Sequence, residues 1–311
     1  MKILLLDKNH PLITDQLTAN NFTLVEDFNS SYDEVLTKVS DYDGIIIRSR
    51  IPIDQNFLEH ATNLKFIARV GAGMENIDVE FAKKVGIALI SSPEGNRDAV
   101  AEQVLGMLLI LMNRLFISSQ EVKSGIWKRE ENRGDELLGK TVGLIGYGNM
   151  GKAVAKRFSG FGCKVIFHDL LPDIGDEFGT QVTLETLKKE ADVLSLHIPI
   201  TNETQYLIDE EFINEMDKNF YFVNTARGKN VKTSDLVAAL KSGKIKGAAL
   251  DVLEFEKASF ENIDTENEDL QFLLKSDKVI VTPHIAGWTI QSKEKLAQVI
   301  VDKILAQFPQ T

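Results

Sequence analysis

The stretch that decides the fold is Thr141–Gly151, which reads TVGLIGYGNMG. An apolar strand pattern precedes the glycines, and the helical pattern AVAKRFSGFG of residues 153–162 follows them. A glycine-rich turn between a strand and a helix lets backbone amides approach a pyrophosphate. Gly146 allows the tight turn, Gly148 allows the close approach, and Gly151 lets the helix pack against the strand. The stretch therefore predicts a dinucleotide site, which also includes the first helical residues, Asn149 and Met150.

An acidic residue after the next strand pattern predicts which dinucleotide binds. The pattern CKVIFHD ends at Asp169, where a carboxylate can accept hydrogen bonds from the adenosine ribose. A carboxylate also repels a 2′-phosphate, and the following Leu170 and Leu171 provide no arginine to bind one. The sequence therefore predicts NAD rather than NADP as the cofactor.

Short apolar runs alternate with helical patterns along the rest of the chain. This alternation is typical of βαβ units, and the runs are continuous because such strands are covered on both faces. The fold class is therefore α/β, with two doubly wound parallel sheets. The expected strands are Ile3–Leu6, Thr23–Glu26, Gly44–Ile47, Lys65–Val70, Ala88–Ile90, Thr141–Ile145, Lys164–Phe167, Val193–Leu196, Phe220–Asn224, Gly247–Leu250 and Val279–Val281.

Composition excludes several functional classes. The 311 residues are 43% hydrophobic and carry a net charge of −11, which argues against a nucleic-acid partner. No apolar run approaches the roughly 18 residues of a membrane span. Cys163 is the only cysteine, so no intramolecular disulfide and no zinc-type cluster is expected, and a cytoplasmic location is predicted. The apolar segment Ala99–Ile117 is expected to be one long helix, buried between domains or against a second subunit.

Three further motifs follow predicted strands of the second sheet: NTARG (224–228), DVLEFE (251–256) and TPHIAG (282–287). Loops at the carboxyl ends of parallel strands bind ligands in open α/β folds. Reduction of a 2-keto acid needs a cation for the substrate oxygens, which Arg227 can supply. It also needs a proton donor, which suits His284, and a neighbouring Glu256 would favour the protonated ring.

Together these motifs make the chain resemble the D-isomer-specific 2-hydroxyacid dehydrogenases over nearly its whole length. The resemblance rests on ARVGAGMENID, PEGN, AEQ, ELLGKTVGLIGYGNMG, LHIPIT, NTARG, LDVLEFE and TPHIAG in family order. It implies that Arg227 binds and polarises the substrate, that Glu256 pairs with His284, and that His284 is the acid/base. Backbone amides of Gly71, Ala72 and Gly73 would hold the substrate carboxylate. The positions expected to line the dinucleotide are Ile198, Thr225, Ala226, Asp251 and Gly287.

The family also implies a domain organisation. Residues 1–96 and 288–311 would form a flavodoxin-like substrate domain, and residues 97–287 the inserted NAD domain, with a cleft between them. The long helix matches the family's dimer-forming region, so a homodimer is expected. One departure concerns Lys257, which stands where the family usually has proline. It makes Glu254 an alternative to Glu256, although the spacing from Asp251 favours Glu256.

A set of arginines indicates the substrate. Arg48 and Arg50 close the strand pattern GIIIRSR, and Arg69 closes the pattern KFIARVG. Arg48 and Arg69 resemble the phosphoglycerate dehydrogenases in their spacing, and Arg129 resembles a third phosphate contact there. The expected substrate is 3-phosphoglycerate, in a short form without the serine-binding domain. Alternatively, the arginines form surface ion pairs and the substrate is a glyoxylate- or lactate-type acid. A dinucleotide-sensing protein without enzyme activity, like the family's corepressors, is also left open.

Overall fold

The computed structural model describes residues 1–256 and 267–310. The chain folds into two compact units. Unit 1 comprises Met1–Arg97 and Trp288–Thr311, and unit 2 comprises Asp98–Gly287. Each unit is built around its own parallel sheet, one of five strands and one of seven. This arrangement confirms the predicted α/β class with two parallel sheets.

The sheet of unit 1 has the order β2-β1-β3-β4-β5, and all its strands are parallel. This is the order of the flavodoxin-like doubly wound fold. The isoleucine- and leucine-rich runs are buried because helices cover both faces. The strands are β1 (Lys2–Leu5), β2 (Thr23–Glu26), β3 (Gly44–Ile47), β4 (Phe66–Arg69) and β5 (Ala88–Ser91).

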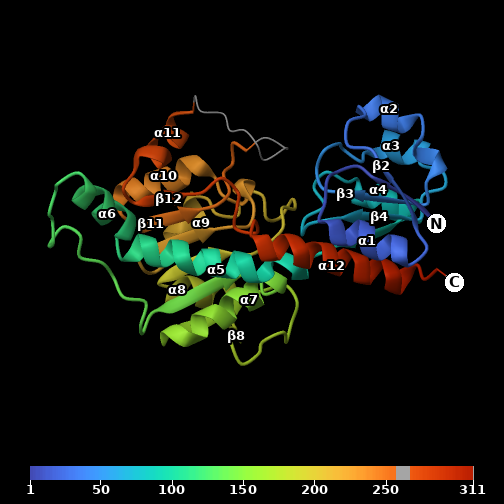
Figure 1. Ribbon diagram of the computed structural model, residues 1–311. Coiled ribbons are helices and arrows are strands. Elements are labelled where there is room, and N and C mark those ends of the chain that lie inside the picture. The colour runs from blue at the N-terminus through green and yellow to red at the C-terminus, as the bar shows by residue number, and fades with distance from the viewer. Residues whose placement is uncertain (257–266, 311) are drawn as a thin grey trace. The chain divides into compact units, whose positions relative to one another are not determined.

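Two helices from opposite ends of the sequence, α1 and α12, lie side by side on one face of this sheet (Figure 1). Helices α2, α3 and α4 pack against the other face. The C-terminal helix α12 begins at a capping box formed by Thr289 and Ser292. The helix bounds are α1 (Pro11–Ala19), α2 (Tyr32–Leu36), α3 (Gln55–His60), α4 (Val79–Lys84) and α12 (Ile290–Gln307).

The sheet of unit 2 has the order β12-β11-β10-β9-β6-β7-β8, again all parallel. The strand order reverses between β6 and β9, which is where doubly wound sheets bind their ligands. Strand β8 was not predicted, because two residues give no readable apolar pattern. The strands are β6 (Thr141–Ile145), β7 (Lys164–His168), β8 (Thr180–Gln181), β9 (Val193–Leu196), β10 (Phe220–Asn224), β11 (Ile245–Leu250) and β12 (Val279–Val281).

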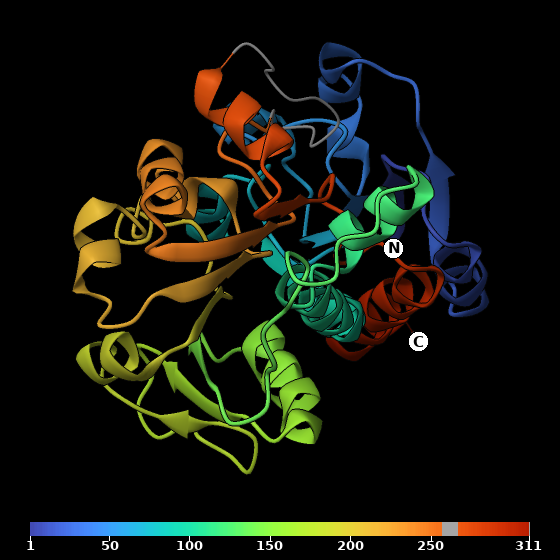
Figure 2. The same cartoon turned by 90° about the vertical axis from the view of Figure 1, so that its left-hand side faces the viewer.

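Helices α5 and α7 cover one face of this sheet, and α8 to α11 cover the other (Figure 2). The alternation is visible within single strands, because Ile166 points into one core and Phe167 into the other. The helix bounds are α5 (Pro93–Met112), α6 (Leu115–Lys123), α7 (Asn149–Phe158), α8 (Leu184–Glu190), α9 (Glu210–Glu215), α10 (Thr233–Ser242) and α11 (Glu268–Lys275).

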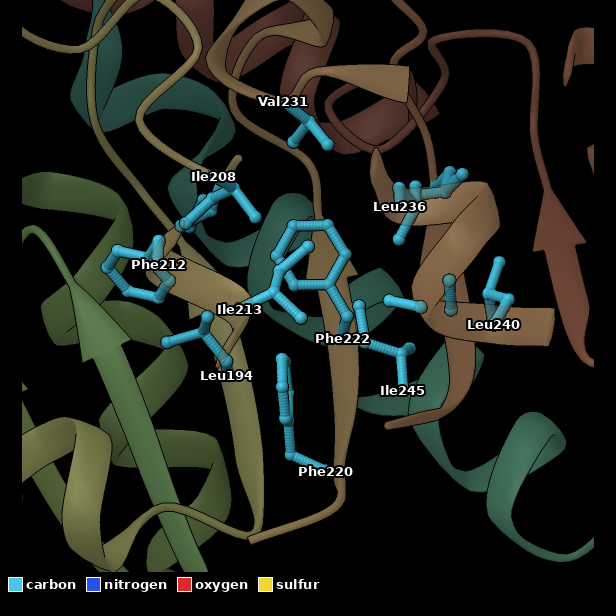
Figure 3. Close-up of a cluster of buried hydrophobic side chains, with 14 of the residues drawn as sticks. Leu194, Ile208, Phe212, Ile213, Phe220, Phe222, Val231, Leu236, Leu240 and Ile245 are labelled. Atoms are coloured by element: carbon cyan, nitrogen blue, oxygen red, sulfur yellow. The ribbon is translucent and has the colours of Figure 1, made fainter. Parts of the chain in front are cut away.

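The larger of these two cores is centred on β10 (Figure 3). Phe220 and Phe222 are fully buried and lie among side chains of α9 and α10, including Phe212 and Leu240. Burial of each such side chain contributes about 1.5–3 kcal/mol to folding. The carboxyl end of β10 is therefore held in a well-packed sheet.

The predicted single helix over Ala99–Ile117 is wrong at its C-terminal end. Helix α5 ends at Met112, and α6 begins at Leu115. Between them Arg114 has φ of 53°, in the left-handed region, which stops the right-handed helix. No single helix in the described part of the chain is long and apolar enough to cross a membrane. The joined pair α5 and α6 reaches that length, with a bend of 59°.

Candidate active site

The glycine turn after β6 has the geometry that a dinucleotide requires. Gly146 has φ of 93°, and a Cβ there would lie 2.5 Å from the carbonyl oxygen of His197. A Cβ on Gly151 would lie 2.2 Å from the carbonyl oxygen of Gly146. Only glycine fits at these two positions without a backbone shift.

The middle glycine, Gly148, leaves the approach to helix α7 open. A Cβ on Gly148 would meet no atom within 4 Å, and no side chain caps the helix that begins at Asn149. The N-terminal amides of α7, including that of Met150, therefore point toward an open position where an anion is favoured. Thr225 adds a buried hydroxyl oxygen, which has no hydrogen-bond partner among the described residues. These features fit a bound dinucleotide.

Asp169, directly after β7, is held by two backbone amides. Its Oδ2 accepts a hydrogen bond from the N–H of Tyr147 at 2.7 Å, and its Oδ1 accepts one from the N–H of Leu171 at 2.9 Å. Each carboxylate oxygen has a second lone pair for a ribose hydroxyl. The hollow next to this carboxylate is lined by His168, Asp169, Gln181, Val182, Thr183, Leu184 and Glu185.

Asp169→Ala is expected to relax the preference for NAD over NADP. The substitution would remove both the hydrogen bonds expected with the ribose and the negative charge expected to repel a 2′-phosphate. The measurement is the ratio of kcat/KM with NADH to kcat/KM with NADPH, in wild type and variant. If the wild-type protein used NADPH as well as NADH, Asp169 would not be the residue that selects the cofactor.

The two residues predicted to transfer the proton come from the loops that follow β11 and β12. Nδ1 of His284 lies 2.7 Å from Oε2 of Glu256, and the two side chains are 27% and 17% exposed. The other oxygen of Glu256 accepts a hydrogen bond from the N–H of Leu253, which fixes the direction of the carboxylate. The pair is thus pre-oriented, with Nδ1 of the ring directed at the carboxylate and Nε2 directed away from it.

The backbone at His284 is held in an uncommon conformation. Its φ is 55°, and its N–H donates to the carbonyl oxygens of Asp251 and Thr282 at 2.9 and 3.0 Å. Left-handed backbone at a residue other than glycine costs of order 1–3 kcal/mol, so surrounding structure must impose it.

Asp251 imposes this conformation through its side chain. It is 1% exposed, and its carboxylate accepts hydrogen bonds from Thr282 Oγ1 at 2.5 Å and from the N–H groups of Ile285 and Ala286 at 2.9 and 2.8 Å. Burial raises the pKa of Asp251. The sequence predicted that Asp251 lines the dinucleotide, but its carboxylate also organises the His284 turn. Gln103, to which the sequence assigned no role, donates to Asp251 and Thr282 and supports the same turn.

Glu254, the alternative partner for His284, has a different function in the fold. Its carboxylate accepts hydrogen bonds from Tyr206 Oη at 2.8 Å and from the N–H of Thr233, at the start of α10, at 3.1 Å. It therefore anchors the loop that carries Glu256. Lys257, whose place in the family pattern raised the alternative, lies outside the described residues.

These two glutamates provide a matched pair of variants. Glu256→Gln is expected to make the reduction reaction fail at lower pH than in wild type, because the variant lacks the negative charge that favours the imidazolium. Glu254→Gln should leave the pH dependence of kcat in place. The measurement is kcat against pH for the three proteins. A Glu256→Gln profile that coincides with that of wild type would remove Glu256 from the pair.

Arg227 lies in the turn after β10, which Asn224 organises. Asn224 accepts a hydrogen bond from the N–H of Ala226 at 3.0 Å and donates one to the carbonyl oxygen of Arg227 at 2.9 Å. Gly228 packs so tightly on the Glu256 loop that a Cβ would lie 2.0 Å from the carbonyl oxygen of Leu253. The turn that contains Arg227 and the loop that contains Glu256 therefore pack closely against each other.

The histidine of the LHIPIT motif, His197, directly follows β9. Burial lowers the pKa of His197 to about 3, and its Nε2 shares a hydrogen bond with Ser195 Oγ at 2.9 Å. The ring is therefore neutral at physiological pH.

Ile198, the next residue along the chain, lies against the glycine turn, next to the Cβ position of Gly146. Gly287 ends unit 2 shortly after the His284 turn.

In unit 1, the loop after β4 presents backbone amides. The N–H groups of Ala72 and Gly73 donate no hydrogen bond within the described residues. Gly71 differs from the expectation, because its N–H points inward to Ser92 Oγ at 3.1 Å and to the carbonyl oxygen of Arg69. The amides available to a carboxylate are therefore those of Ala72 and Gly73, while Gly71 shapes the loop.

The arginines of unit 1 lie at the carboxyl ends of two neighbouring strands. Arg48 follows β3, and its guanidinium lies 4.5 Å from the ring centroid of Trp288. Arg69 ends β4, and its Nε donates to the carbonyl oxygen of Arg48 at 3.2 Å. Arg50 serves the fold instead, because it donates to three backbone carbonyl oxygens. Arg129 belongs to unit 2 and is exposed in the segment that follows α6.

Comparison with known proteins identifies the family. The family model described as "D-isomer specific 2-hydroxyacid dehydrogenase, NAD binding domain" matches residues 105–286. The chain belongs to the D-isomer-specific 2-hydroxyacid dehydrogenases. This confirms the resemblance drawn from the motifs, together with NAD as the cofactor and oxidoreductase activity.

Individual relatives cover most of this dehydrogenase. It is 37% identical to a hydroxypyruvate reductase of Thermotoga maritima, over 88% of each chain. It is 34% identical to a D-3-phosphoglycerate dehydrogenase of Methanocaldococcus jannaschii, over 94% of this chain and 56% of the relative. Among solved structures, a D-lactate dehydrogenase of Aquifex aeolicus complexed with NAD and lactic acid has a TM-score of 0.82 and 30% identity, covering 99% and 96% of the two chains.

Proposed function

We propose that this dehydrogenase interconverts D-3-phosphoglycerate and 3-phosphohydroxypyruvate, with NAD as the cofactor. The observation that supports a phosphorylated substrate is the pair of arginines Arg48 and Arg69. Arg48 directly follows β3 and Arg69 ends β4, the neighbouring parallel strand, and Ala72 and Gly73 lie in the loop that follows β4. Arginine forms paired hydrogen bonds to phosphate and carboxylate oxygens, and an acidic protein must gather such cations locally.

The geometry of the His284–Glu256 pair supports the proposed roles in proton transfer. NAD, when bound, supplies the hydride acceptor for oxidation of the hydroxy acid. In that direction neutral His284 takes the hydroxyl proton at Nε2, while Nδ1 faces Glu256, which stabilises the resulting imidazolium. In reduction the imidazolium returns the proton to the keto oxygen. Arg227 binds the substrate oxygens and polarises the carbonyl group.

The amides of Ala72 and Gly73 hold the substrate carboxylate. The Trp288 ring supports a role of Arg48 in phosphate binding. A guanidinium stacked on an aromatic face loses little hydration, and its edge remains available for hydrogen bonds. Arg129, exposed and flanked by Glu130 and Glu131, is proposed as a third phosphate contact.

A second candidate is reduction of an unphosphorylated 2-keto acid such as hydroxypyruvate or glyoxylate. Relatives named hydroxypyruvate reductase and glyoxylate reductase are slightly more similar to this chain than those named D-3-phosphoglycerate dehydrogenase. In that case Arg48 and Arg69 would serve the unit 1 fold, as Arg50 does.

The test of the proposed activity is oxidation of NADH with a panel of 2-keto acids. The panel contains 3-phosphohydroxypyruvate, hydroxypyruvate, glyoxylate and pyruvate, and each product is analysed for its D configuration. We expect sustained turnover with the highest kcat/KM for 3-phosphohydroxypyruvate. Absence of turnover with every member would contradict the assigned substrate class.

We also propose that the protein is a homodimer that forms through α6 and the segment after it. No residue of α6 is buried, and Phe116 and Trp127 are 56% and 77% exposed. Exposed apolar side chains on one segment are typical of a protein interface, and α6 begins within Ala99–Ile117, the segment that matches the family's dimer-forming region. Light scattering should give twice the mass of the 34.7 kDa chain. A single-chain mass at micromolar concentration would contradict the proposal.

A further inference from the structure

The second residue of the glycine fingerprint, Tyr147, connects the turn to the loop beyond Asp169. Its side chain is 0% exposed and stacks on Phe167, with ring centroids 3.6 Å apart and an interplanar angle of 6°. Its hydroxyl donates to Asp176 Oδ1 at 2.6 Å, and the N–H of Phe178 donates to the same oxygen at 2.9 Å. The phenol therefore fixes the far end of the loop that begins at Leu170.

Two further features close the same loop. A Cβ on Gly179 would lie 2.6 Å from Tyr147 Oη, so the chain passes directly over the phenol. Gln181 binds the near end, since its Nε2 donates to the carbonyl oxygen of Leu171 at 2.7 Å and its Oε1 accepts from the N–H of Ile174 at 3.2 Å. Burial, together with the bond to Asp176, raises the pKa of Tyr147, so the phenol remains a hydrogen-bond donor.

The loop matters because it supplies one of the two amides that orient Asp169. The N–H of Leu171 binds one oxygen of Asp169, and the N–H of Tyr147 binds the other. Tyr147 thus acts on the ribose-binding carboxylate twice, directly through its backbone and indirectly through the loop that its hydroxyl holds. The loop sequence LLPDIGDEFG (residues 170–179) contains three acids and no cation, so a fixed loop also keeps negative charge close to Asp169, which directly precedes it.

We propose that the hydrogen bond between Tyr147 and Asp176 makes Tyr147 a positioning residue for cofactor selection. It holds the Leu170–Gly179 loop so that Asp169 can bind the ribose of NAD and the loop resists a 2′-phosphate. The inference concerns cofactor binding only and does not depend on which 2-keto acid the enzyme reduces.

The experiment is calorimetric titration of NADH and NADPH into the substrate-free protein. Tyr147→Phe should raise the Kd for NADH about three- to tenfold, which is the range for loss of one hydrogen bond, and should narrow the NADH to NADPH preference. Asp176→Ala should have the same effect. Asp176→Asn, which keeps an acceptor for the phenol, should restore binding close to the wild-type value.

A matched control is available in the same unit. Tyr221 is also a buried tyrosine, 9% exposed, whose hydroxyl donates to a carboxylate, Asp135 Oδ2, at 3.0 Å. Tyr221→Phe should lower the unfolding temperature to a similar degree and leave both cofactor affinities unchanged. The proposal is overturned if Tyr147→Phe binds NADH as tightly as wild type, or if Tyr221→Phe weakens binding equally.

Discussion

Replacing His284 with alanine is expected to lower kcat by about 10²- to 10⁴-fold, the range of general acid–base catalysis, and to change the Kd for NADH little. The expectation follows from the geometry around the ring. Nδ1 of His284 is committed to Glu256, and the turn that carries the ring is held by Asp251. We therefore expect the imidazole to act in the transition state of proton transfer rather than in cofactor binding.

Two measurements separate this role from a structural one. NADH titration should show the same affinity in His284→Ala as in wild type, and kcat should fall with every keto acid that the enzyme accepts. His60→Ala is a suitable control, because His60 is an exposed histidine of unit 1, at the end of α3. A loss of NADH affinity that parallels the loss of turnover would indicate that the substitution damages the unit 2 fold.

Arg69→Ala is expected to reduce kcat/KM for 3-phosphohydroxypyruvate by about 10- to 100-fold, since a hydrogen bond to a charged group contributes about 1.5–3 kcal/mol. The loss for hydroxypyruvate should be smaller, because that substrate lacks the phosphate. Arg133→Ala removes an exposed arginine that pairs with Glu130 and should change neither value. Equal losses of Arg69→Ala on both substrates would assign Arg69 to the fold of β4 or to the carboxylate.

The parts of the site that sequence predicts well are those whose residue type is imposed locally. Gly146 and Gly151 occupy positions where a Cβ would overlap backbone atoms. The backbone geometry of the turn therefore requires glycine at both positions, and the glycine motif predicts that geometry. The spacing within DVLEFE indicated Glu256, and the structure places Glu256, rather than Glu254, at 2.7 Å from His284. Continuous apolar runs also predicted the strands. Such runs occur because helices cover both faces of each sheet.

The features that sequence did not predict depend on contacts between distant segments. Nothing near Arg114 indicates that its backbone is left-handed and ends the long helix. The N–H of Gly71 points to Ser92 rather than outward, which only the packing of β5 against β4 determines. The bond between Tyr147 and Asp176 joins residues 29 positions apart, and no periodic pattern encodes it.

The central claim is that this dehydrogenase selects a phosphorylated substrate, and one ratio tests it most directly. It is the kcat/KM for 3-phosphohydroxypyruvate divided by that for hydroxypyruvate, measured on the wild-type protein with NADH. If Arg48 and Arg69 bind the phosphate, the ratio should be on the order of 10 or more, the value of one charge-assisted contact. A ratio near one would contradict the claim and assign the enzyme to the unphosphorylated 2-keto acids.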